Sequence, residues 1–232
     1  MPMQPDAASQ HIDVKVYGNT GNANVLSLVP PAAKAVLDIG CGRGDNARHL
    51  QQQGIVVDGI SISEKEIELA SPYLRSGVLY DVEQGLPDSI KANTYDAVIC
   101  SHIIEHIRYP ESLLKDILKV MNPNSVFIMA LPNIMHYRSR WQLVKGNFNY
   151  TESGIWDNTH VKWYTIKTAK ELLIKNGFDI VSADVTGDVP FLSVFKVLPV
   201  KARKGIFNML KGMSKGFFGY ELLFVSKIKA SA

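Results

Sequence analysis

Apolar and polar positions alternate along the chain in blocks that predict strands followed by helices. Short apolar runs predict strands at residues 35–39, 55–60, 78–80, 97–100 and 126–130. Helices are predicted over 45–53 and 111–121, where Leu113, Leu114, Ile117, Leu118 and Met121 recur at helical spacing. Strands that alternate with helices of about ten residues are typical of a parallel sheet with helices on both faces. The pattern therefore predicts an α/β fold.

The two ends of the chain and one internal segment depart from this alternation. Residues 1–33 are polar and then briefly apolar, which predicts a lead-in helix or cap before a single domain over 34–232. Residues 132–165 are rich in Asn, Tyr, Trp and His without a clean period, so we expect a long loop that caps the sheet after its fifth strand. Loops of this length in compact domains are usually functional. A helix over 168–175 and strands over 178–185 and 221–228 complete the prediction.

Composition excludes several classes of protein. The chain has 232 residues, with 25 basic against 22 acidic side chains, a balance too even to predict a nucleic-acid partner. Two cysteines, Cys41 and Cys100, are too few for a disulfide framework and fit a reducing, cytoplasmic compartment. The longest run without Asp, Glu, Lys or Arg, residues 120–137, contains two prolines, so no membrane span is expected. The first residues lack the pattern of a signal peptide.

A glycine-rich turn follows the first predicted strand and carries the clearest chemical signal. Gly40, Gly42 and Gly44 stand at alternate positions, where glycine lets the backbone adopt positive φ and approach a ligand closely. This predicts a nucleotide-like site at the carboxyl end of that strand. The spacing differs from the dinucleotide fingerprint G-x-G-x-x-G. Asp38 stands just before the glycines, where a carboxylate suits a cationic ligand better than a pyrophosphate.

The run from Leu37 to Gly42 resembles the first motif of the class I S-adenosylmethionine-dependent methyltransferases. The resemblance implies a Rossmann-like sheet of seven strands with the last one antiparallel, and S-adenosylmethionine as cofactor. It further implies that Asp38 faces the amino-acid part of the cofactor, and that Gly40, Cys41 and Gly42 leave room for it.

Further positions match the same family in order. Ser61 stands where the family usually has an acid that binds both ribose hydroxyls, and a neutral hydroxyl makes a weaker hydrogen bond than a carboxylate. The resemblance implies that Asp81 reads the adenine amino group beside the backbone of Val82. It also implies that Ser101 and His102 line the cofactor cleft after the fourth strand.

The segments 104–106, 131–136, 145–150 and 154–165 resemble the MetW-like, or methyltransferase 23, branch of this family. Members of that branch are often associated with glycosyltransferases of surface-polysaccharide synthesis. The resemblance, over residues 17–185, implies O-methylation of a sugar hydroxyl on a nucleotide- or lipid-linked acceptor. Phenolic, quinone and amine acceptors stay open. So does a non-catalytic binding partner of a glycosyltransferase, which the neutral Ser61 favours.

Histidines supply the candidate bases for such a reaction. His160 is the main candidate, because a histidine of near-neutral pKa can take the proton of an attacking hydroxyl. Asp157, three residues earlier, is expected to orient it, and His102 is a second catalytic candidate. Alternatively, His160 only fixes its loop by a buried hydrogen bond. No metal site is predicted, because none of the histidines and acids shows compact ligand spacing such as H-E-x-x-H.

The basic segment, residues 191–218, combines lysines with apolar residues. Ile206, Met209, Leu210, Met213 and Phe217 fall on one predicted helical face. Such a helix can pack on the sheet with its lysines solvated, or lie in a membrane interface against anionic lipid. A peripheral membrane contact is therefore the second expectation for this segment.

Overall fold

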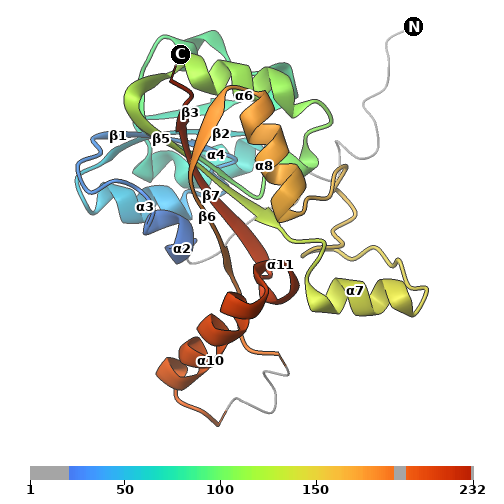
Figure 1. The fold of residues 1–232 in the computed structure, drawn as a ribbon. Helices are drawn as coiled ribbons and strands as arrows, with labels where there is room; N and C mark the ends of the chain where they lie inside the picture. The colour runs from blue at the N-terminus through green and yellow to red at the C-terminus, as the bar shows by residue number, and fades with distance from the viewer. Residues whose placement is uncertain (1–20, 191–196, 231–232) are drawn as a thin grey trace, which may run out of the picture.

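A seven-stranded sheet forms the centre of the computed structural model, which describes residues 21–190 and 197–230. The strand order is β3-β2-β1-β4-β5-β7-β6 (Figure 1). The strands are β1 Ala35–Ile39, β2 Val56–Ser61, β3 Ser76–Leu79, β4 Tyr95–Ser101, β5 Met121–Pro132, β6 Phe178–Thr186 and β7 Glu221–Ile228. The first five strands pair in parallel, and β7 pairs antiparallel with both β5 and β6. The predicted sheet with an antiparallel last strand is confirmed.

Helices cover both faces of this sheet and bury two apolar clusters. The α-helices are α2 Ala23–Leu26, α3 Asp45–Gln51, α4 Glu64–Ala70, α5 Asp88–Lys91, α6 Pro110–Lys119, α7 Tyr137–Val144, α8 Ile166–Lys175, α10 Val200–Met213 and α11 Lys215–Phe218. Three single 3₁₀ turns are η1 Ser71–Tyr73, η2 Val82–Gln84 and η3 Ile104–His106. Leucines of α6 and α8 pack in one cluster, and residues of α2 and α3 in the other.

The structure differs from the predicted elements mainly between residues 132 and 175. The segment expected to be a loop contains helix α7, in which only Ser139 is buried and Trp141 and Val144 are exposed. Because α7 presents no apolar stripe to a core, periodicity gives no signal for it. Helix α8 begins two residues earlier than predicted, because Thr165 and Thr168 form a capping box.

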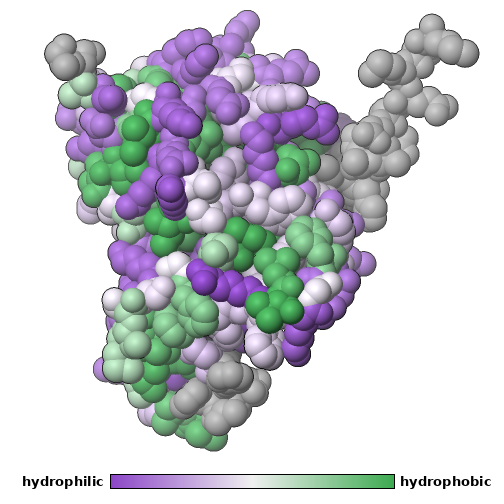
Figure 2. Space-filling view, turned by 45° about the vertical axis from the view of Figure 1, so that its right-hand side comes forward, coloured by the Kyte–Doolittle hydropathy of each residue, from purple (hydrophilic) through white to green (hydrophobic). Residues whose placement is uncertain are grey.

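The described part of the basic segment extends from the body on helices α10 and α11 (Figure 1). Phe207 is buried, and Lys211 forms an ion pair with Asp184 of β6, so one side of α10 packs against the sheet. This side is not the predicted apolar face, which contains Met209 and Met213. Met209 and Met213 are exposed, and Figure 2 shows hydrophobic residues gathered over this end of the molecule. Among the residues that the structure describes, no helix is long and apolar enough to span a bilayer. Membrane contact stays a prediction, and residues 1–20 and 191–196 lie outside the described part.

Candidate functional site

The carboxyl ends of β1, β2 and β4 open onto a cavity of about 1030 Å³. Most of the residues singled out from the sequence line it: Gly40, Cys41, Gly42, Ser61, Asp81, Val82, Ser101, His102, Asp157 and His160. The lead-in segment contributes Gly21 to Asn24 to the lining. Asp38 and Gly44 are not part of the lining. Residues as far apart as Gly21 and Tyr220, 199 positions, therefore meet at one site.

The glycine turn has the backbone that a close ligand approach requires. Gly40, Gly42 and Gly44 have φ values of +73°, +52° and +82°. A Cβ on Gly40 would lie 1.9 Å from the side chain of Ile103, so no other residue fits there without a rearrangement. The N–H groups of Gly40 and Cys41 donate to the carbonyl of Ile60 at the end of β2. These bonds fix the turn at the mouth of the first two strands.

Asp38 is a buried acid. Its residue is 1% exposed, and among the described residues neither carboxylate oxygen has a hydrogen-bond partner of ordinary geometry, although the Asn46 side chain approaches it. Burial raises the pKa of Asp38 to about 7, and the nearby Asn46 side chain opposes the rise. An unpaired buried carboxylate costs folding free energy. Its position therefore fits a role in attracting a cationic group of a ligand.

The carboxylate of Glu66 contacts Ser61, and the sequence alone did not identify Glu66 as a site residue. The Ser61 hydroxyl donates to Glu66 Oε2 at 2.6 Å and accepts from the N–H of Ser63 at 3.0 Å. Glu66 is 6% exposed and lines the cavity in the first turn of α4. Ser63, the N-cap of α4, accepts from the Glu66 N–H, so in the sequence this pair has the spacing of an ordinary helix cap.

Two further acids near the expected cofactor positions, Asp58 and Asp81, also form contacts within the fold. Asp58 is buried, accepts from Tyr95 at 2.7 Å and pairs with Arg75, so it links β2 to the start of β4 and to the residue before β3. Asp81 lines the cavity and caps η2 by accepting from the N–H of Glu83 at 2.9 Å. Val82 is buried beside it.

His102 lies between two buried carboxylates. Its Nε2 is 2.8 Å from Glu221 Oε1, and its Nδ1 is 3.4 Å from Glu105 Oε1. Burial alone would lower the pKa of His102, but the two carboxylates outweigh it and raise the pKa to about 10. An imidazolium that holds its proton at neutral pH does not accept another. His102 is therefore a cation of this site rather than the proton acceptor that the sequence suggested.

We expect this pairing to stabilise the fold in a pH-dependent way. Because the folded pKa lies above the unfolded value, the stabilisation is complete below about pH 6.5 and is lost as pH rises through about 10. His102→Asn, chosen because Asn tolerates the left-handed φ of 58°, should lower Tm by several degrees at pH 6. The deficit should disappear near pH 10.5. His106→Asn is the control, since His106 contacts Thr159 instead of a carboxylate. A deficit that does not change with pH would contradict the pairing.

His160 presents one ring nitrogen to the cavity. Its Nδ1–H donates to the carbonyl of Ile155 at 3.2 Å, which leaves the lone pair on Nε2, 3.9 Å from Glu105 Oε1. Burial lowers the pKa of His160, although Glu105 opposes this. Neutral at pH 7, His160 can accept a proton at Nε2.

Asp157 lies in the turn before His160. Its carboxylate accepts from the N–H and hydroxyl of Thr159, at 2.9 and 2.6 Å, so it shapes this turn. The carbonyl of Ile155 accepts from His160 Nδ1, and the charge of Asp157 opposes the lowering of the His160 pKa. The orienting role of Asp157 stays a prediction.

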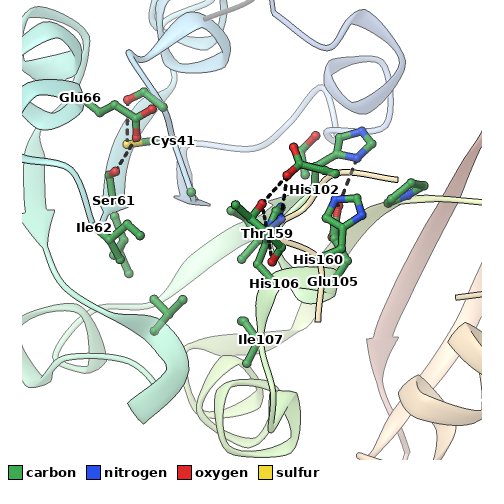
Figure 3. A pocket seen from close by; sticks show the side chains of 18 of the residues that line it. Cys41, Ser61, Ile62, Glu66, His102, Glu105, His106, Ile107, Thr159 and His160 are labelled. Carbon is green, nitrogen blue, oxygen red and sulfur yellow. Dashed lines mark hydrogen bonds and ion pairs between the residues drawn. The ribbon is translucent and has the colours of Figure 1, made fainter. Parts of the chain in front are cut away.

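Glu105 is the central acid of this cluster, shown with His102, His106 and His160 in Figure 3. It is 1% exposed, and its carbonyl accepts from the N–H groups of Val161 and Lys162, which ties η3 to the loop of His160. Glu105, His106 and His160 each offer a ligand atom within 4.8 Å of the others. These are ligand types that Zn²⁺ takes, and the expected absence of a metal stays a prediction.

Comparisons with known proteins show similarity to methyltransferases. A family described as "Methyltransferase domain" matches residues 19–183. A ubiquinone biosynthesis O-methyltransferase of Rickettsia canadensis is 33% identical over 102 residues, which cover 43% of each chain. Another, of Histophilus somni, is 25% identical over 162 residues, covering 66% of this chain and 67% of the relative. The chain thus spans less than half the length of some curated relatives that it matches.

Solved structures share the fold. A SAM-dependent methyltransferase from Archaeoglobus fulgidus superposes with a TM-score of 0.61 at 22% identity, covering 85% of this chain and 87% of that one. An O-methyltransferase from a polyketide synthase of Brevibacillus brevis, in complex with S-adenosyl-L-homocysteine, has a TM-score of 0.54 at 20% identity. It covers 88% of this chain and 70% of that one. At these identities the likeness shows the fold alone.

Proposed function

This chain belongs to the methyltransferase-domain family, and from that premise we propose that it is an S-adenosylmethionine-dependent O-methyltransferase. Residues in and beside the cavity support this donor. The buried carboxylate of Asp38 suits the ammonium group, the glycine turn leaves room for the backbone of the amino-acid part, and Asp81 with Val82 suits the adenine ring. When bound, S-adenosylmethionine offers an electrophilic methyl group on a positively charged sulfur.

The orientation of His160 carries the proposal of a hydroxyl acceptor. Its Nδ1–H is held by the carbonyl of Ile155, so Nε2 stands ready to take the proton of the attacking hydroxyl. The acceptor oxygen then bonds to the methyl carbon while its proton passes to His160. The buried Glu105 carboxylate, 3.9 Å from Nε2, stabilises the imidazolium that forms. General-base catalysis of this kind contributes about 100- to 10,000-fold to a rate.

Two acceptor classes compete for this site. The sugar hydroxyl expected from the sequence rests on the resemblance of residues 131–165 alone. A phenol is favoured by its acidity. A phenolic hydroxyl ionises near pH 10, whereas a sugar hydroxyl is an aliphatic hydroxyl and is closer to water, whose pKa is about 15.7. A histidine whose pKa is lowered by burial matches the more acidic acceptor better. Relatives named ubiquinone biosynthesis O-methyltransferase support the same choice. We therefore propose a phenolic acceptor and keep a sugar hydroxyl as the second candidate.

The decisive experiment separates donor binding from methyl transfer. Calorimetric titration with S-adenosylhomocysteine should show micromolar binding, and NADH, the control, should not bind. Transfer of a labelled methyl group should then occur to polyhydroxylated phenols faster than to nucleotide sugars. Faster transfer to the sugars would restore the glycan prediction. Binding without transfer to any hydroxyl would instead support a cofactor-binding partner of a glycosyltransferase.

A further inference from the structure

The sheet order places the end of β2 midway along the proposed donor. Strands β3, β2 and β1 are neighbours in that order. Asp81 follows β3 and Asp38 lies at the end of β1, so the adenine and amino-acid ends of the donor fall on either side of β2. Ribose, which joins those two ends, therefore falls at Ser61. Ribose presents two neighbouring hydroxyls, and both can donate to a single carboxylate.

Ser61 cannot serve these hydroxyls as an acid would. Its own proton is directed to Glu66 Oε2, at 2.6 Å, and its oxygen already accepts from the N–H of Ser63. A carboxylate offers about four acceptor sites on its two oxygens, so it can accept from several donors at once. Figure 3 shows Ser61 and Glu66 together at the part of the cavity beside Cys41, away from the histidine cluster.

We propose that Glu66 is the ribose-binding acid of this protein and that Ser61 holds it in place. In the family that the sequence resembles, an acid at the position of Ser61 usually supplies this carboxylate. Here the carboxylate comes from the first turn of α4. Burial at 6% exposure strengthens its hydrogen bonds to a ligand, and charge-assisted bonds are about twice as strong as neutral ones. The inference rests on the proposed donor and is independent of the acceptor.

The test measures binding of S-adenosylhomocysteine and of its analogue without the 2′- and 3′-hydroxyls. Glu66→Ala should weaken binding of S-adenosylhomocysteine about 10- to 100-fold, and Glu66→Gln, which keeps the side-chain shape, should be intermediate. The analogue should bind the wild type weakly and lose little more in either variant. Glu68→Gln, at an exposed position of the same helix, is the matched control and should bind both ligands as the wild type does.

A second experiment places an acid at residue 61, where the family usually has one, and tests whether binding is recovered. Ser61→Asp in the Glu66→Ala background should recover most of the lost affinity, whereas Ser61→Asp alone should weaken binding by placing two carboxylates together. Equal losses for both ligands would assign Glu66 a structural role and overturn the proposal, as would unchanged binding in Glu66→Ala. If the wild type itself does not bind S-adenosylhomocysteine, the proposed donor falls, and the ribose-binding role with it.

Discussion

His160→Ala should lower kcat by about 100- to 10,000-fold while leaving the affinity for S-adenosylhomocysteine unchanged. The imidazole faces the cavity through Nε2 and is the group placed to remove the acceptor proton. It stands apart from Ser61, Asp81 and the glycine turn, so donor binding should not depend on it. Steady-state kinetics with the best phenolic acceptor and calorimetry with S-adenosylhomocysteine measure the two effects separately.

The pH profile distinguishes a base from a residue that only supports its loop. Because the pKa of His160 is lowered from 6.5, kcat of the wild type should rise with pH below 6.5 and level off above it. That rising limb should be missing in His160→Ala. His136→Gln is the matched control, since this histidine is buried but does not line the cavity. A rate within about tenfold of the wild type, with an unchanged pH profile, would leave His160 with the loop-fixing role.

The parts of the site that could be predicted are contiguous in the sequence. Asp38 and the three glycines stand in one strand and turn, so their chemistry and spacing are visible without a fold. The order of apolar blocks likewise gave the sheet, because buried parallel strands are short apolar runs. The predicted site residues that follow β1, β2, β3 and β4 line one cavity because parallel strands bring their carboxyl ends to the same edge.

The parts that could not be predicted depend on pairs formed by the fold. Glu105 approaches His160 across 55 positions, and His102 pairs with Glu221 across 119. No spacing rule reports such contacts, so His102 was taken for a base although its partners fix its proton. Glu66 is local to Ser61, but its pattern with Ser63 is also that of a helix cap. The sequence is therefore compatible with Glu66 as a helix-cap residue or as a site residue, and only the structure shows that it also lines the cavity.

Asp38→Asn should have opposite effects on folding and on binding. The folded pKa of Asp38 is about 7, raised from 3.8, so folding disfavours its ionised form. The wild type should therefore lose stability as pH rises from about 4 to 7 and stay lower above it. A neutral Asn removes this penalty, and Tm of the ligand-free protein at pH 8 should rise by roughly 2–4 °C per kcal/mol regained. Asp58→Asn, which removes a paired acid, should lower Tm instead.

The same substitution should weaken binding of S-adenosylhomocysteine about 100-fold or more at pH 8, because the ligand ammonium loses its buried partner. In the wild type, affinity should fall as pH drops below 7 and Asp38 becomes protonated, whereas Asp38→Asn should show no such fall. Thermal denaturation without ligand and calorimetry from pH 6 to 8 measure both effects. A variant that is less stable and binds normally would mean that the carboxylate serves the fold. A more stable variant that binds poorly would show that this acid is kept, at a cost in stability, for the ligand.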